Sequence, residues 1–94
     1  MRTAINFPNS SRSYDETAHG VRFWGYDQSL EISFLIEEDA LKNMSSRAIV
    51  NKRGVLRTFD LNLGWIRKEA EILYSRRRTG SHDCFFRLTA TDFE

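Results

Sequence analysis

The run Ser81-His82-Asp83-Cys84 places a thiol, an imidazole and a carboxylate next to one another in the sequence. Nucleophilic catalysis by cysteine uses these groups, with the histidine base within hydrogen-bond reach of the sulfur. Adjacent residues on a strand point to opposite faces, however, and catalytic Cys and His residues usually come from distant segments. Cys84 is therefore interpreted as a small apolar strand residue and His82 as a turn residue. A small enzyme that uses Cys84 and His82 ranks third among our hypotheses, and we predict no enzymatic activity and no catalytic residue.

The sequence contains no pattern typical of a metal-binding or cofactor-binding site. The possible metal ligands are His19, His82, Cys84 and scattered carboxylates, and no pair has the i, i+4 or CxxC spacing of common metal sites. The five glycines are too dispersed for a phosphate-binding loop. We predict no metal site and no cofactor.

The basic run Arg76-Arg77-Arg78 could contact nucleic acid, with Trp24 and Tyr26 available to stack on bases. Basic residues in the last turn of a helix also complement the negative end of its dipole, which explains the run without a ligand. The formal net charge of the chain is only +1, far from the strongly basic footprint of most nucleic-acid binders. Weak RNA or DNA binding through Arg76, Arg77 and Arg78 is therefore the alternative function.

These residues would be positioned by one long helix. Residues 52–78 keep a helical period over several turns, with Asn51 as the predicted N-cap and Gly80 just past the end. The apolar residues spaced three and four apart form one face that should pack on a sheet. They are Leu56, Phe59, Leu63, Ile66, Ala70 and Leu73.

The rest of the chain has mainly the pattern of strands. Residues 13–15, 21–26, 30–36 and 84–91 have extended or alternating patterns, whereas residues 38–44 form a short helix that begins with acidic side chains. The predicted fold class is α+β, in two layers. A three- or four-stranded antiparallel or mixed sheet carries one long and one short helix on one face. The strand order is left open.

Length and composition indicate one domain over residues 1–94. Of the residues, 40% are hydrophobic, which is enough for a packed core, and there is one proline. No apolar run approaches the roughly 18 residues of a membrane span, and the first residues lack the apolar stretch of a signal peptide. The single cysteine agrees with a reducing compartment. We expect a cytoplasmic protein with no membrane partner.

Several short motifs occur in a recognisable order. They are Arg12-Ser13-Tyr14-Asp15, Val21-Arg22-Phe23-Trp24-Gly25, residues 37–41, the helix with Phe59, Ile66, Ala70 and Tyr74, and the closing Leu88-Thr89-Ala90-Thr91-Asp92-Phe93. In this order the sequence resembles the bacterial family known as domain of unknown function 1488 (DUF1488). The resemblance implies a bacterial, cytosolic, single-domain α+β protein. It implies no activity and no site residues.

The long helix has a second apolar side. At 100° per residue, Leu61, Trp65 and Ile72 lie opposite Phe59 and Ile66. Either the short helix and residues 48–50 cover this side, or another molecule does. Our preferred interpretation is a small cytosolic, non-enzymatic accessory or interaction protein that self-associates as a homodimer through Leu61, Trp65 and Ile72. A further protein partner would be of unknown identity.

Overall fold

The computed structural model of the chain describes residues 5–8, 12–45, 49, 51–77 and 86–93. Its sheet has four strands: β1 (Arg12–Asp15), β2 (Gly20–Asp27), β3 (Leu30–Glu37) and β4 (Phe86–Leu88). The spatial order is β1-β2-β3-β4, in which β1, β2 and β3 run antiparallel and β4 runs parallel to β3. The predicted α+β class with a mixed sheet is confirmed, and the strand order that the sequence left open is now defined.

Two tight turns connect the first three strands. Asp15 ends β1, and its carboxylate accepts a hydrogen bond of 2.9 Å from the backbone N–H of Ala18. His19 closes that turn with a positive φ of 55°, and Gln28 has a φ of 60° in the turn between β2 and β3. Both residues adopt the left-handed conformation that tight turns require, although neither is a glycine.

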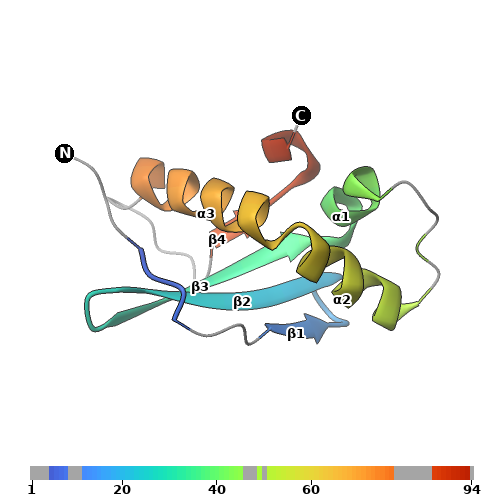
Figure 1. The fold of residues 1–94 in the computed structure, drawn as a ribbon, viewed down its shortest axis with the longest axis horizontal. Helices are drawn as coiled ribbons and strands as arrows, with labels where there is room; N and C mark the ends of the chain where they lie inside the picture. The colour runs from blue at the N-terminus through green and yellow to red at the C-terminus, as the bar shows by residue number, and fades with distance from the viewer. Residues whose placement is uncertain (1–4, 9–11, 46–48, 50, 78–85, 94) are drawn as a thin grey trace.

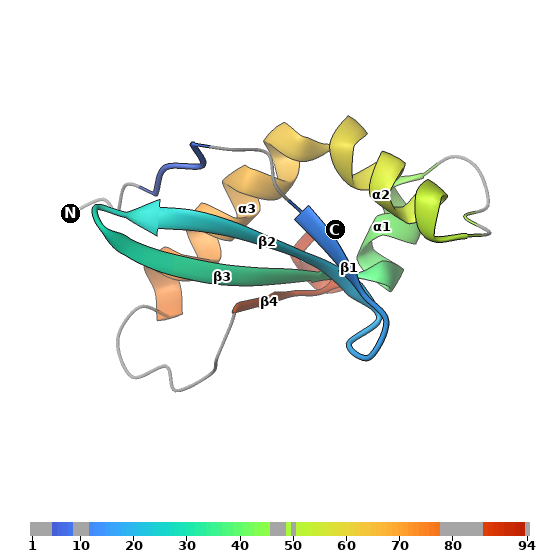
Figure 2. The same ribbon diagram turned by 90° about the horizontal axis from the view of Figure 1, so that it is seen from below.

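Three helices cover one face of this sheet (Figures 1 and 2). They are α1 (Glu38–Met44), α2 (Lys52–Leu61) and α3 (Leu63–Arg77). The short helix has the predicted bounds, and both predicted helical segments lie on one face. The prediction of a single long helix is corrected, because the chain bends at Asn62 and divides that helix into α2 and α3.

The bend at Asn62 has a local cause. The Asn62 side chain donates a hydrogen bond of 2.9 Å to the carbonyl of Thr58. The backbone N–H of Asn62 donates both to the same Thr58 carbonyl and to the carbonyl of Phe59. Asparagine competes in this way with regular helical bonding. The backbone N–H of Ile66 still donates to the carbonyl of Asn62, so the helical period passes through the bend. The spacing of the apolar residues therefore predicts one continuous helix and does not reveal the bend at Asn62.

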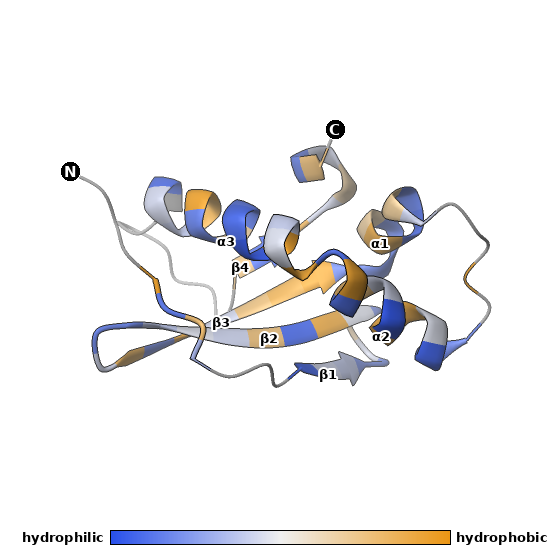
Figure 3. Cartoon of the chain, in the orientation of Figure 1, coloured by the Kyte–Doolittle hydropathy of each residue, from blue (hydrophilic) through white to orange (hydrophobic). Residues whose placement is uncertain are grey.

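The core lies between the helices and the sheet. Along β2 and β3 the inward residues alternate with outward ones, and in α2 and α3 the predicted apolar face points at them. Figure 3 shows the hydrophobic colour running along β3 under the helices. Phe23 stacks on Phe34 with ring centroids 5.2 Å apart, and Phe59 of α2 tilts against Phe23 at the same distance. The buried set includes Val21, Ile32, Ile36, Phe59, Ile66, Ala70, Leu73 and Leu88.

The C-terminal segment differs from its prediction. The alternation predicts a strand over residues 84–91, of which residues 84 and 85 lie outside the described residues. Strand β4 covers Phe86–Leu88 and ends before Thr89, and a 3₁₀ helix, η1 (Ala90–Phe93), follows. The Asp92 carboxylate accepts a hydrogen bond of 2.8 Å from the backbone N–H of Thr89, and the Asp92 N–H donates to the Thr89 carbonyl. This side-chain turn ends the strand early, and it brings Phe93 back to the core, where it is buried.

Candidate functional site

The residues of the enzyme hypothesis, Cys84 and His82, lie outside the described residues, as does Arg78. Arg77 is the last residue of α3, and the preceding Arg76 is exposed to solvent. The described part of the chain holds no group of three or more His, Cys, Asp or Glu side chains that could bind a metal ion. Among the described residues, no helix is long and apolar enough to cross a membrane.

Trp24 and Tyr26 lie on the face of the sheet opposite to the helices. Their neighbours in β2, Phe23 and Gly25, are buried on the helical side, and side chains alternate along a strand. Tyr26 donates a hydrogen bond of 3.1 Å to Glu31 of β3 on that opposite face, which raises the pKa of the phenol. The fold therefore separates these two aromatic side chains from Arg76 on α3 by the thickness of the sheet.

The proposed interface residues differ in exposure. Leu61 at the end of α2 is 73% exposed, whereas Trp65 in α3 is 45% exposed. The Trp65 ring meets the buried Phe93 of η1 edge to face, with centroids 5.4 Å apart and an interplanar angle of 79°. Ile72, further along α3, is half-buried. The second apolar side of the helix is thus partly covered by the chain's own C-terminal turn at Trp65 and left open at Leu61.

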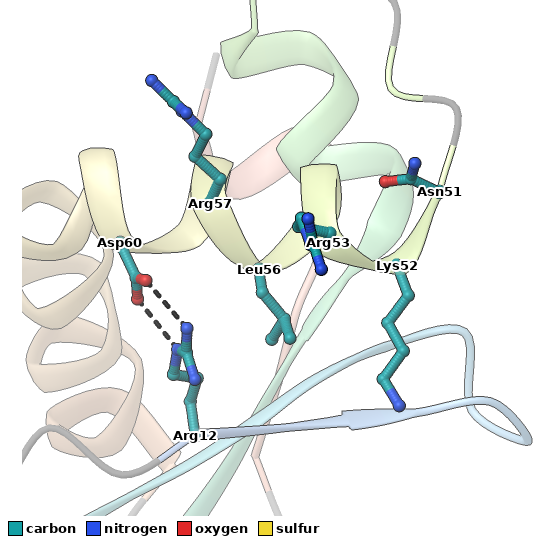
Figure 4. Close-up of a pocket in the computed structure, with 7 residues that line it drawn as sticks. All are labelled: Arg12, Asn51, Lys52, Arg53, Leu56, Arg57 and Asp60. Atoms are coloured by element: carbon teal, nitrogen blue, oxygen red, sulfur yellow. Dashed lines mark hydrogen bonds and ion pairs between the residues drawn. The ribbon is translucent and has the colours of Figure 1, made fainter.

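A basic hollow lies between β1 and α2 (Figure 4). We use this name for the open space of about 730 Å³ that seven residues line: Arg12, Asn51, Lys52, Arg53, Leu56, Arg57 and Asp60. Four of the seven carry a positive charge, and one carries a negative charge. Sequence reasoning missed this site, because Arg12 is remote in sequence from the helix that completes it.

Helix α2 has an unusual start beside the hollow. The Asn51 side chain caps it as predicted, accepting a hydrogen bond of 2.8 Å from the backbone N–H of Gly54. The first turn of α2 holds the basic residues Lys52 and Arg53 and no acidic residue, whereas α1 begins with Glu38 and Asp39. Cations are unfavourable at the positive end of a helix. This reversed charge pattern is the sequence signal that could have indicated the hollow.

Arg12 and Asp60 form the one ion pair inside the hollow among the described residues. The Arg12 Nε and Nη2 atoms each donate a hydrogen bond of 2.9 Å to one oxygen of the Asp60 carboxylate. These hydrogen bonds raise the pKa of the Arg12 guanidinium above its ordinary value. In Figure 4 the side chains of Leu56 and Lys52 extend from α2 towards β1, whereas Arg57 extends away from that strand.

Lys52 is held only loosely. Its Nζ atom lies 6.0 Å from the centroid of the Tyr14 ring, a weak cation–π distance. Tyr14 in turn donates a hydrogen bond of 2.7 Å to Glu38 of α1, and this bond raises the pKa of the Tyr14 hydroxyl. Among the described carboxylates, none lies within ion-pair distance of Lys52, Arg53 or Arg57. Three positive charges around the hollow therefore have no acidic counterpart in the described structure.

A second hollow, of about 410 Å³, lies near the start of α1 and includes Glu37 and Glu38 in its lining. Apart from Asp39, its described carboxylates already have partners. Glu37 accepts a hydrogen bond of 2.9 Å from Arg87, and Glu38 accepts one from Tyr14 and lies 3.7 Å from Lys42. The basic hollow is therefore the better candidate for binding a charged ligand.

The fold and the site together define a small two-layer α+β domain that carries the basic hollow between β1 and α2. A family model described as "Protein of unknown function (DUF1488)" matches residues 5–82. The chain belongs to this family.

One solved structure has the same fold. It is the crystal structure of a DUF1488-family protein of unknown function from Shewanella loihica PV-4, at 1.60 Å resolution. The two chains are 19% identical, the match covers 94% of each, and the TM-score is 0.79. No curated protein matches the sequence. The function is thus unknown for the family, and the fold is shared.

Proposed function

We propose that this protein is a small, non-enzymatic interaction protein of the bacterial cytoplasm, and that it self-associates through the side of α2 and α3 that carries Leu61 and Trp65. The observation that carries this proposal is the exposure of both side chains at the junction of the two helices. Large apolar and aromatic residues at the surface favour association, and tryptophan is enriched at the centres of interfaces.

The junction also favours a symmetric contact. Leu61 and Trp65 are four residues apart on either side of Asn62, and the hydrogen bond from Ile66 N–H to the Asn62 carbonyl continues the helical path between them. The exposed Lys68 and the half-buried Glu69 follow in α3 and would form a polar rim. Helices that meet across a two-fold axis bury the same side chains from both copies. Trp65 of one copy would then pack near Leu61 and Ile72 of the other.

Sedimentation equilibrium of the parent and of Leu61→Glu tests this proposal. We expect a parent dimer and a folded Leu61→Glu monomer, because the substitution places a charge in the contact without disturbing the core. Leu30→Glu is the matched control, since Leu30 is 60% exposed but lies at the start of β3, opposite Asp27 of β2, and not at the junction of α2 and α3. A monomeric parent at high micromolar concentration would contradict the proposal, and so would a dimer that survives Leu61→Glu.

Weak RNA or DNA binding through Arg76, Arg77 and Arg78 stays the alternative prediction. Its test is the retardation of mixed oligonucleotides at low salt by the parent and by a variant with all three arginines replaced by glutamine. Loss of binding at every sequence alike would support phosphate contact by this run. The absence of any retardation by the parent would remove the alternative.

A further inference from the structure

We infer that the basic hollow binds the phosphate groups of a small organic phosphate. This inference is independent of self-association, because it concerns another surface and another class of ligand. The observation behind it is the excess of positive charge around a hollow in which the one carboxylate among the described lining residues, that of Asp60, is already held by Arg12. A ligand that supplies several negative charges in a compact group would balance the positive charges of Lys52 and Arg53.

Folding stability does not explain this placement of charge. Lys52 and Arg53 lie in the first turn of α2, where the helix dipole is positive, and Arg57 follows one turn later. Arg53 and Arg57 are four residues apart on the same helix, a spacing at which like charges repel. An anion bound between them would relieve both effects, and it would also interact favourably with the positive end of α2. The placement of these positive charges is therefore suited to a protein that has an anion bound in the basic hollow.

The residue types favour phosphate as the anion. Three of the four cations are arginines, whose planar guanidinium groups hydrogen-bond phosphate oxygens in pairs, and the fourth is a lysine that can act as a point charge. In Arg12 this two-atom geometry is already present, with the Asp60 carboxylate as the acceptor. A phosphate group could share that guanidinium or displace the carboxylate from it.

The size of the hollow favours a small ligand. Its volume of about 730 Å³ falls within the range of about 300 to 1,000 Å³ that is usual for small-molecule sites. Leu56 extends towards β1 and supplies an apolar surface for the organic part of the ligand (Figure 4). Apart from Arg12, the cations of the hollow lie within the first two turns of α2, and this compact group suits a small phosphate better than an extended nucleic-acid strand.

The test is a titration of the ¹⁵N-labelled protein with pyrophosphate, ADP, adenosine and a mixed-sequence single-stranded oligonucleotide at constant ionic strength. We expect saturable shifts of the Gly54 amide and of the Arg12 Nε–H signal with ADP and none with adenosine. Equal binding of pyrophosphate would mean that the phosphates alone suffice, whereas tighter binding of ADP would show that the organic part contributes. No saturable shift with pyrophosphate or ADP would overturn the inference, and so would binding of the oligonucleotide alone.

Matched charge variants locate the site. Lys52→Gln with Arg53→Gln should weaken ADP binding by about tenfold or more, the factor expected when a charge-assisted hydrogen bond is lost. Lys68→Gln with Arg76→Gln removes one lysine and one arginine from exposed positions of α3 and should leave binding within about twofold of the parent, because distant exposed charges are screened. Asp60→Asn frees Arg12 and should tighten binding. Equal losses in the two paired variants would overturn the inference, since they would indicate a response to net charge alone.

Discussion

Arg12 of β1 and Asp60 of α2 form a two-atom ion pair, with both hydrogen bonds at 2.9 Å, that ties the edge strand to the helical layer. Both side chains are partly exposed, at 32% and 50%. A double-mutant cycle with Arg12→Gln and Asp60→Asn should give a coupling free energy of about 0.5 to 1 kcal/mol, the upper part of the range for exposed pairs. Urea unfolding of the four proteins measures it. A coupling indistinguishable from zero would mean that β1 is held by the sheet alone.

Phe59 is the centre of contact between α2 and the sheet. It is 1% exposed and packs against Phe23. Phe59→Ala should lower the free energy of unfolding by about 3 to 5 kcal/mol, because it removes a buried ring and leaves a cavity. Thermal unfolding measures the effect, with Leu30→Ala as the control at an exposed position, where about 0.5 kcal/mol or less is expected. Melting temperatures of parent and Phe59→Ala within two degrees of each other would contradict the assigned core.

Asp15 gives the fold a defined response to acid. Its carboxylate accepts a hydrogen bond of 2.6 Å from Arg22 Nε and another from the Ala18 N–H, and these bonds, the first above all, lower the pKa of Asp15 below its ordinary 3.8. The ionised form is therefore favoured by the folded state. Its stabilising contribution is present above the unfolded pKa and is lost as the pH falls through the lower folded pKa.

Comparison with Asp15→Asn isolates this contribution. The amide can still accept the turn hydrogen bond but carries no charge. The melting temperature of the parent should exceed that of Asp15→Asn at pH 7, and the difference should shrink as the pH falls below the ordinary pKa of an aspartate. A difference that stays constant over this range would show that the carboxylate charge is not the cause.

Gly64 offers a simple stabilising substitution. It lies in the first turn of α3, and a methyl group added to it would meet no atom within 4 Å. Gly64→Ala should raise the free energy of unfolding by about 0.4 to 1 kcal/mol, chiefly by restricting the unfolded chain. Gly20→Ala is the contrasting variant, because its added carbon would clash with the Ile36 carbonyl oxygen and should destabilise the protein. If Gly64→Ala instead destabilises a dimer, then Gly64 lies within the interface.

Local chemistry made much of the fold predictable. Asn51 begins α2 as its capping side chain indicated, and the acidic start at Glu38 correctly marked α1. The face formed by Phe59, Ile66 and Ala70 is buried as its period predicted. Each of these features depends on residues close together in the sequence, where spacing carries the information.

The differences have a common origin in side-chain hydrogen bonds and long-range pairing. The bend at Asn62 keeps the helical period, so the apolar spacing could not reveal it. The early end of β4 depends on Asp92 binding Thr89, and the alternation of residues 84–91 carries no sign of that turn. The basic hollow needs Arg12 beside Asp60, a contact between residues 48 positions apart in the sequence. The basic residues Lys52 and Arg53 at the start of α2 are visible in the sequence. The sequence does not show, however, that β1 lies beside them and completes the hollow with Arg12.

The parallel pairing of β3 with β4 also determines the order in which the chain can fold. Strands β1, β2 and β3 are joined by tight turns and can form a sheet from local contacts, whereas the pairing of Phe34 with Phe86 closes a loop that contains α1, α2 and α3. Closing so long a loop has an entropic cost, and such contacts form late. We expect substitutions within the β2–β3 hairpin to slow refolding and those in β4 mainly to speed unfolding, so that the last strand sets the lifetime of the native state rather than its rate of formation.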